Sequence, residues 1–260
     1  MMDALAAGAT ELGFALSTSH LTQFERYYRE LVSWNQRFNL TAVTDYEQVQ
    51  RRHFLDSLTC MLAFPHGASG AVPNHLPVQR PGVVVRCADV GSGAGFPGIP
   101  LAILMSDAQF TLIESVGKKA GFLEHVAALL GLRNVSVICS RAEDVGRQEQ
   151  HRECYDVVLA RAVAALNSLA EYCLPLCRLG GRMIAPKGHD AAAELDEAAY
   201  AIEVLGGRVV ACKAIVVPGE EEERSLVVID KVTHTPERYP RNAGMPTKRP
   251  LRAISRSAVG

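Results

Sequence analysis

The pattern of apolar and polar positions predicts a helical region at the start of the chain. One apolar face at helical spacing is formed by Leu21, Phe24, Tyr28 and Leu31. Farther along, Thr44-Asp-Tyr-Glu47 has the pattern of a capping box and predicts that a second helix begins there. We therefore expect an N-terminal helical extension over residues 1–64.

From residue 83 onward, short apolar runs alternate with longer helical patterns. Strands are predicted near 83–90, 109–114, 134–139, 155–161, 181–187, 208–217 and 224–231. Helices are predicted near 97–105, 117–131, 165–179 and 190–205. This alternation is typical of an α/β, Rossmann-like, doubly wound fold. The last two strands can pair as a hairpin, which predicts a seven-stranded, mostly parallel sheet.

Composition divides the chain further. Residues 65–82 are rich in Pro, Gly, Ala and polar side chains and are predicted to be a linker before an α/β domain at 83–232. Residues 233–260 contain four prolines and are predicted to form a basic, extended tail. Counted from residue 231, the end of the chain has seven Lys or Arg and one Glu, whereas the whole chain has a formal charge of −1. A basic tail on an acidic body indicates a polyanionic partner, with a solubilising tail as the alternative.

The cysteines and the hydropathy pattern exclude several classes of protein. There are seven cysteines, an odd number, without a C-x-x-C pair, which indicates a reducing, cytoplasmic setting and no metal site. No apolar run reaches the ~18 residues of a membrane span, and no membrane partner is expected. The N-terminus has Asp3 and Glu11 without an early Lys or Arg, unlike a secretory signal. We expect a monomer.

The first predicted strand leads into a glycine-rich loop that ends at Gly98. The loop includes Gly91, Ser92, Gly93 and Gly95 and matches the G-x-G-x-x-G pattern of nucleotide-binding folds. Asp89 at the end of the strand would repel a phosphate, and Pro97 removes a backbone donor that a phosphate needs. A ligand with a positive end fits better, and S-adenosylmethionine is the predicted cofactor, with Asp89 meeting its charge directly or through water.

Glu114 ends the second predicted strand, where a carboxylate can accept both ribose hydroxyls of an adenosine. The loop after the third strand, Ser140–Glu143, suits recognition of adenine by a backbone N–H and a side-chain acceptor. An NAD-dependent dehydrogenase and an ordinary strand-to-helix turn with two solvated acids remain alternatives.

Basic side chains follow several of the predicted strands. Because the carboxyl ends of parallel strands meet at one edge, five of them are expected on one rim: Lys118, Lys119, Arg141, Arg161 and Lys187. Such a rim suits a phosphodiester backbone, although each residue alone could form a surface ion pair. Arg51 and Arg52 on an N-terminal helix could also face RNA phosphates, or could belong to a solvated helix face.

Seven segments together resemble one family of proteins. They are Trp34-Asn-Gln-Arg-Phe-Asn-Leu-Thr41, Arg52-His-Phe-Leu-Asp-Ser57, Asp89-Val-Gly-Ser-Gly-Ala-Gly-Phe-Pro-Gly-Ile-Pro100, Glu114-Ser-Val-Gly-Lys-Lys119, Ser140-Arg-Ala-Glu143, Ala160-Arg-Ala162 and Pro186-Lys-Gly188. From about residue 20 to the tail, the chain resembles the bacterial RsmG family, also called glucose-inhibited division protein B. These proteins are 16S ribosomal RNA guanine-N7 methyltransferases of class I, which use S-adenosylmethionine.

The resemblance implies a set of site residues. Cofactor contacts are implied at Gly91, Phe96, Ala142, Glu143 and Arg161, and a positively charged crevice is implied around Lys118, Arg141 and Lys187. The implied substrate is 16S ribosomal RNA of the 30S subunit, as naked RNA, in a precursor particle or in the finished subunit.

The residues themselves are consistent with transfer to guanine N7. That atom has a free lone pair at neutral pH, and the sequence offers no general base in the crevice. We expect an in-line displacement with Arg161 as the catalytic residue that spans cofactor and guanine. Two alternatives remain: a non-catalytic RNA-binding module on the same fold, and a small-molecule or protein methyltransferase.

Overall fold

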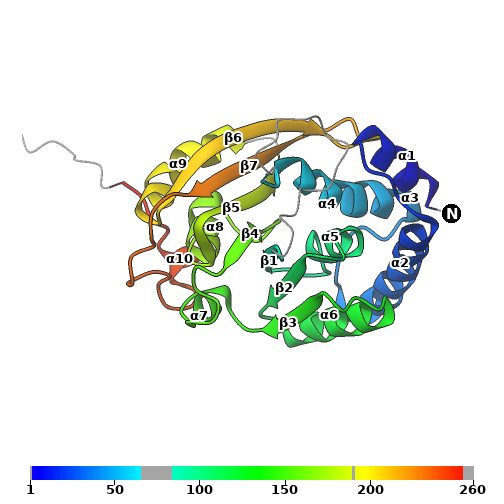
Figure 1. Cartoon of the computed structure of the whole chain (residues 1–260), viewed down its shortest axis with the longest axis horizontal. Coiled ribbons are helices and arrows are strands. Elements are labelled where there is room, and N and C mark those ends of the chain that lie inside the picture. The colour runs from blue at the N-terminus through cyan, green and yellow to red at the C-terminus, as the bar shows by residue number, and fades with distance from the viewer. Residues whose placement is uncertain (1, 66–83, 189–190, 254–260) are drawn as a thin grey trace, which may run out of the picture.

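The computed structural model describes residues 2–65, 84–188 and 191–253. A seven-stranded sheet lies between two layers of helices, with strand order β3-β2-β1-β4-β5-β7-β6 (Figure 1). The strands are β1 Arg86–Val90, β2 Gln109–Glu114, β3 Val135–Cys139, β4 Tyr155–Leu159, β5 Cys177–Lys187, β6 Gly207–Val216 and β7 Glu223–Lys231. Only β7 runs antiparallel to its neighbours β5 and β6. The predicted fold class, a Rossmann-like, seven-stranded and mostly parallel sheet, is confirmed.

Ten α-helices are present in the described part of the chain. They are α1 Asp3–Glu11, α2 Thr18–Phe38, α3 Tyr46–Val49, α4 Asp56–Thr59, α5 Gly98–Leu104, α6 Gly117–Leu129, α7 Ala142–Val145, α8 Leu166–Cys173, α9 Ala191–Val204 and α10 Met245–Lys248. A π-helical stretch, Gln50–Leu55, joins α3 to α4, so the three form one continuous rod.

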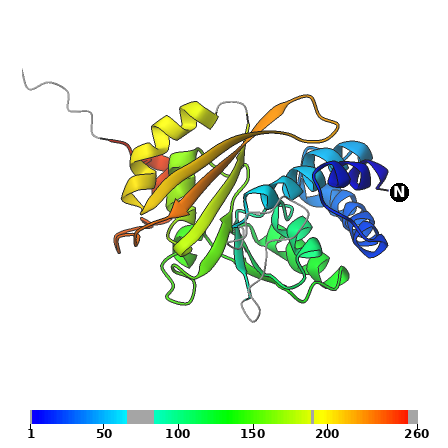
Figure 2. The ribbon, with the colours of Figure 1, turned by 45° about the horizontal axis from the view of Figure 1, so that its top comes forward.

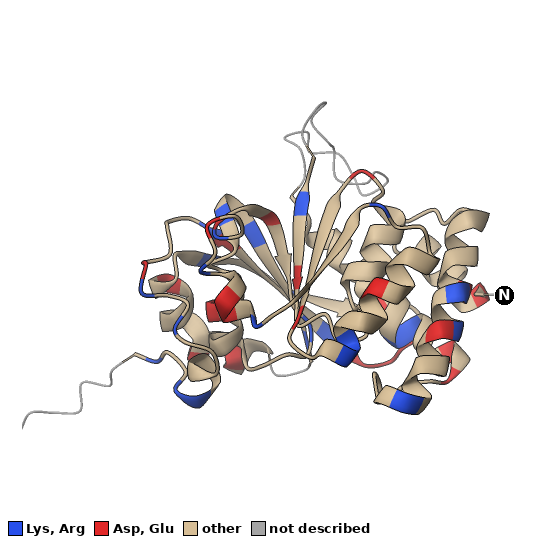
Figure 3. Ribbon diagram, turned by 90° about the horizontal axis from the view of Figure 1, so that it is seen from below, with Lys and Arg blue, Asp and Glu red and all other residues tan. Residues whose placement is uncertain are grey.

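In β1, β2, β4, β5 and β7, side chains alternate between two hydrophobic cores, one on each face of the sheet. On β4, Val157 and Leu159 belong to the core that α2, α5 and α6 cover, while Val158 belongs to the core under α8 and α9. Because both faces of these strands are buried, their sequences are nearly continuous apolar runs. Charged positions lie on the strands as well as on the flanking helices and loops (Figure 3).

The N-terminal helices share the first core with the sheet. Phe24, Tyr27 and Phe54 are fully buried. The Tyr27 hydroxyl donates to the Ala94 carbonyl in the glycine loop. The ring of Trp34 lies 5.5 Å from that of Phe122 on α6, and Trp34 packs against this core.

The hairpin of β6 and β7 reaches the N-terminal helices at its turn (Figure 2). There, Arg52 Nε lies 2.9 Å from Glu220 Oε2. This contact joins the N-terminal helices to the β6–β7 turn, although the two residues are 168 positions apart in sequence.

Some predicted elements differ from the structure. The helix predicted at 165–179 was wrong in its second half, because α8 ends at Cys173 and β5 begins at Cys177. Pro175 lies between them and has no N–H with which to continue the helical hydrogen bonds. The helix predicted to begin at Thr44 is capped one residue later by Asp45, whose carboxylate accepts from Glu47 N–H. The short helices α7 and α10 were not predicted.

The domain boundaries remain predictions. All but the first residue of the predicted linker, 65–82, lies outside the described residues. Residues 233–253 of the predicted tail are mostly irregular and lie against the sheet-bearing part of the chain. Among the described residues, none of the helices has the length and apolar character needed to cross a bilayer.

Candidate active site

A cavity of about 190 Å³ lies at the carboxyl ends of β1, β2 and β3. Its lining includes Gly91, Ile113, Glu143, Val163, Tyr172 and Thr247. This is the edge of a doubly wound sheet at which ligands bind, since the loops after the strands diverge there. The first and third predicted loops therefore meet at one site, together with Thr247 from the far end of the chain.

The glycine loop after β1 needs its glycines for conformation and for space. Gly91, Gly93 and Gly95 have φ values of +67°, +58° and +97°, a region that disfavours residues with a Cβ. A Cβ on Gly91 would lie 2.6 Å from Val163 Cγ2, whereas a Cβ on Gly93 would have only the Gly91 carbonyl oxygen nearby, at 3.8 Å. Position 93 is thus open to a ligand from the side where a Cβ would project.

Glu114 holds this loop in place. The carboxylate is almost fully buried at the end of β2. Its Oε2 accepts from Gly93 N–H at 2.9 Å and its Oε1 from Val116 N–H at 2.8 Å. The contact with ribose predicted for Glu114 would use the remaining lone pairs of these same oxygens.

Asp89 and Ser92 lie beneath the loop. Asp89 is fully buried, and its Oδ2 accepts from Gly98 N–H at the start of α5 at 3.0 Å. Its Oδ1 has no hydrogen-bond partner among the described residues, and burial raises the pKa of this carboxyl to about 7. The Ser92 hydroxyl donates to the Asp89 carbonyl at 2.8 Å. Both residues shape the turn here, and their contact with a cofactor stays a prediction.

Arg161, Phe96 and His53 form a stack beside the loop. The His53 ring lies 4.5 Å from the Phe96 ring, and Arg161 Cζ lies 5.2 Å from the same ring. Arg161 Nη1 pairs with the buried carboxylate of Asp56 and donates to the Arg52 carbonyl at 3.1 Å. Burial and the Arg161 guanidinium lower the pKa of His53 to about 4, so this ring is neutral at pH 7.

Asp56 contacts Arg161 and was not among the predicted site residues. Its side chain is 1% exposed and also lies 3.3 Å from Arg224 Nε. The signal was present, because Asp56 is part of the Arg52–Ser57 segment that carried the family resemblance. What the segment did not reveal is that Asp56, at the start of α4, pairs with Arg161, which follows β4.

The predicted RNA-binding residues fall into two groups. Lys118 and Arg141 are exposed and Lys119 is half-buried; the two lysines lie in the first turn of α6, and Arg141 follows β3. Arg141 is also part of the cavity lining, so the basic rim and the cavity are continuous there. These three positions are suited to contact phosphates.

The other three predicted RNA-binding residues are held by carboxylates. Lys187 Nζ lies 2.7 Å from Glu194 Oε2 and donates to the Ala164 carbonyl at 2.9 Å. Arg51 pairs with Glu47 at 3.1 Å, and Arg52 pairs with Glu220. These cations would have to exchange a partner in order to meet a phosphate.

The cavity can bind a nucleoside, and its lining places the cationic side chain of Arg141 beside such a ligand. Ile113 and Val163 offer apolar surface in the cavity, and Glu143 offers a carboxylate. Among the described residues, no group of three or more His, Cys, Asp or Glu side chains is placed to bind a metal ion.

Comparison with known proteins gives a consistent match. The family model described as GidB, rRNA small subunit methyltransferase G, matches residues 20–227. Ribosomal RNA small subunit methyltransferase G from Roseiflexus sp. (strain RS-1) is 52% identical over 250 residues, which cover 96% of this chain and 100% of that protein. The protein of the same name from Chloroflexus aggregans is 47% identical over 242 residues, covering 93% of this chain and 94% of that protein.

A solved structure of M. jannaschii TYW2 in complex with AdoMet is 15% identical, with a TM-score of 0.44 over 57% of this chain and 70% of that chain. This likeness is too distant to support an inference.

Proposed function

The chain belongs to the family of rRNA small subunit methyltransferase G, and on this premise we propose that it methylates N7 of a guanine in 16S ribosomal RNA with S-adenosylmethionine. The observation that carries the proposal is the coincidence of two features. The family match covers residues 20–227, and the cavity beside the glycine loop is lined by residues of this range together with Thr247.

The residues around the cavity fit the cofactor. At about 190 Å³ the cavity is smaller than the ~300 Å³ or more of a whole-ligand pocket, and it matches the nucleoside end of the cofactor. Ile113, Ala142 and Val163 would contact the base, with Glu143 at its edge. When bound, S-adenosylmethionine supplies a methyl group on a positively charged sulfur.

The remaining proposed cofactor residues lie at the ends of the first two strands and in the glycine loop, with Phe96 and Arg161 beside that loop. Glu114 would accept from the ribose hydroxyls, and the loop of Gly91, Ser92, Gly93 and Gly95 would lie along the cofactor. Asp89 would act through water or through the turn that it holds.

Arg161 is the proposed catalytic residue. Asp56 and the Arg52 carbonyl fix its guanidinium beside Phe96, so it can orient an incoming guanine between the rim and the cofactor site. Because N7 carries a lone pair at neutral pH, the chain has no proton to remove, and positioning provides the rate enhancement. His53 stays neutral and adds no charge to this cluster.

The RNA is proposed to follow the basic rim. Lys118, Lys119 and Arg141 would contact phosphates directly. Lys187, Arg51 and Arg52 are proposed to join them after exchanging their carboxylate partners. The substrate is 16S ribosomal RNA in the 30S subunit, which places the enzyme in the cytoplasm.

The test is transfer of labelled methyl from S-adenosylmethionine to 30S subunits and to protein-free 16S RNA, both from a strain that lacks this enzyme. The RNA is then digested to nucleosides. The expected product is labelled 7-methylguanosine. RNA binding without transfer, or label in a different acceptor, would contradict the proposal.

A further inference from the structure

After β7, the chain runs back to the cavity at the carboxyl ends of β1, β2 and β3. It runs from Val232 to α10, where Thr247 contributes to the cavity lining. The family match ends at residue 227, so this segment lies beyond it. Three sets of polar contacts hold the segment in place.

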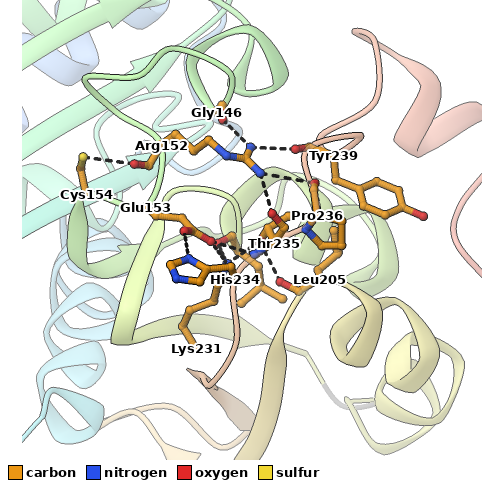
Figure 4. A network of polar contacts seen from close by, with 11 residues as sticks. Gly146, Arg152, Glu153, Cys154, Leu205, Lys231, His234, Thr235, Pro236 and Tyr239 are labelled. Atoms are coloured by element: carbon orange, nitrogen blue, oxygen red, sulfur yellow. Dashed lines mark hydrogen bonds and ion pairs between the residues drawn. The ribbon is translucent and has the colours of Figure 1, made fainter.

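The first set of contacts follows directly after β7 (Figure 4). The guanidinium of Arg152 donates to the Tyr239 and Thr235 carbonyls, both at 2.7 Å. Glu153 accepts from Thr235 N–H at 2.8 Å and lies 3.0 Å from the buried Lys231 Nζ. The loop after α7 thus binds the backbone of the segment at two points, Thr235 and Tyr239.

The second set involves two more arginines. Arg147 Nε donates to the Pro240 carbonyl at 3.0 Å. Arg241 forms a fork on Glu171, with Nη2 at 2.6 Å from Oε2 and Nε at 2.9 Å from Oε1. Since the Glu171 side chain is fully buried, this ion pair fixes the segment against α8. Charge-assisted, two-point contacts of this kind are among the stronger polar contacts in proteins.

The third set reaches the cavity itself. Gly244 N–H donates to Glu143 Oε1 at 2.8 Å. The Ser168 hydroxyl on α8 donates to the Pro246 carbonyl at 2.9 Å. The Thr247 Oγ1 lies 2.6 Å from the Tyr172 hydroxyl, and both residues line the cavity with Glu143.

We propose that Asn242–Lys248 is a wall of the cofactor site and that the Thr247 hydroxyl binds the nucleoside end of the cofactor. This inference rests on the proposed function, because it takes the cavity to be the S-adenosylmethionine site. A hydroxyl has one donor and two acceptor positions. The Tyr172 contact uses one of them, so Thr247 has capacity left for a polar edge of the base or the ribose.

The wall also couples cofactor binding to the docking of the segment. Glu143 is a proposed cofactor residue, and the Gly244 amide engages one of its two carboxylate oxygens. A ligand that binds the docked form and not the undocked form stabilises the docked form by mass action. The cofactor should therefore protect this segment.

The first experiment measures binding of S-adenosylhomocysteine by calorimetry. Thr247→Val is expected to weaken it about 3- to 10-fold, the effect of one hydrogen bond. Thr247→Trp, whose indole would occupy part of the cavity, is expected to abolish measurable binding. Thr22→Val is the matched control, since Thr22 is exposed on α2 and its hydroxyl also has an intramolecular partner, the Thr18 carbonyl.

The second experiment follows trypsin cleavage after Arg241 and Lys248 with and without S-adenosylhomocysteine. Cleavage of the wild type and of Thr22→Val is expected to slow with ligand, in proportion to occupancy. Provided that the wild type binds S-adenosylhomocysteine, either of two results would overturn the inference. One is an unchanged affinity of both Thr247 variants, and the other is a cleavage rate that is the same with and without the ligand. If the wild type itself does not bind S-adenosylhomocysteine, the cofactor assignment in the proposed function fails instead.

Discussion

At the scale of single residues, the pairing of Arg161 with Asp56 is the feature on which the proposed chemistry depends most. Arg161 comes from the end of β4 and its partner from α4, so two parts of the chain define one cation position. A buried carboxylate that holds a guanidinium acts as a positioning residue: it need not touch the substrate for its loss to slow the reaction.

Asp56→Asn is expected to lower kcat for methyl transfer about 10- to 100-fold, because small misplacements of an orienting group have effects of that size. The affinity for S-adenosylhomocysteine should stay within about 2-fold, since Asp56 does not line the cavity. Both quantities are measured on folded protein, verified by circular dichroism.

The matched control for that variant is Asp230→Asn. Asp230 also pairs with an arginine, Arg182 at 2.7 Å, but across β5 and β7 away from the stack. It should lose stability without a loss of kcat. Equal losses of kcat in the two variants would show that Asp56 acts through general stability and not through Arg161.

Asp89 predicts a pH dependence of stability. Burial raises its pKa from 3.8 to about 7, so the folded state binds more protons than the unfolded state between these values. The free energy of unfolding contributed by Asp89 should therefore fall as pH rises through that window, by up to about 1.4 kcal/mol per pH unit. Asp89→Asn removes the titration, and the difference between wild type and variant isolates it in urea denaturation at several pH values.

The comparison with a variant is needed because His53 acts in the opposite direction. Its pKa is lowered from 6.5 to about 4, so the folded state binds fewer protons and stability rises with pH in that window. Between pH 4 and 6.5 the two effects partly cancel in the wild type. A difference between wild type and Asp89→Asn that does not change with pH would show that Asp89 is ionised throughout.

Some residues of the proposed site could be predicted from the order of the strands, and others could not. Glu114 and Arg161 were identified because the ends of parallel strands meet at one edge, a rule that needs only strand order. Asp56 and Thr247 reach the same place from a helix before the sheet and a segment after it. Their positions depend on tertiary packing, which no local pattern encodes.

At the scale of elements, the glycine loop is the part that a single methyl group can disrupt. Gly93→Ala introduces a Cβ at φ +58° and fills the open side of the loop. It is expected to lower the free energy of unfolding by about 1 kcal/mol and to abolish binding of S-adenosylhomocysteine. Chemical denaturation and calorimetry measure the two effects.

Gly121→Ala on α6 is the matched control for the loop variant. It lies within a helix, and a Cβ there would have no neighbour within 4 Å. This change should stabilise the protein by about 1 kcal/mol, because alanine favours the helix. If Gly93→Ala binds the ligand as tightly as Gly121→Ala, the loop does not line the cofactor.

Element by element, the strands were easier to predict than the helix ends. Strands buried on both faces have β-branched runs that stand out from their surroundings. The boundary between α8 and β5 was misplaced because Leu174 and Leu176 continue the apolar pattern across Pro175. The short α7 and α10 have four residues each, too few to show a period.

At the scale of the whole molecule, the N-terminal helices and the C-terminal segment lie on two flanks of the proposed site. The helices supply Asp56 and His53, and the segment supplies Thr247. Neither flank belongs to the alternating strands and helices that fix the sheet. Composition predicted a tail with a polyanionic partner, whereas the structure pairs Arg241 with Glu171 and Arg252 with Glu197. Two of its cations therefore contact this chain, although Lys248 and Arg249 remain exposed.

The basic rim as a whole predicts how RNA binding depends on salt. Each phosphate contact that is lost should reduce the slope of log K against log salt by about 0.7 to 0.9. Lys118→Ala and Arg141→Ala should each do so, measured by filter binding to 16S RNA between about 50 and 200 mM salt. Lys187→Ala should change the slope less, since Glu194 already neutralises this ammonium group. Lys213→Ala, an exposed change on β6, is the control. If Lys213→Ala reduces the slope as much as Lys118→Ala, binding follows net charge and the rim is not the RNA path.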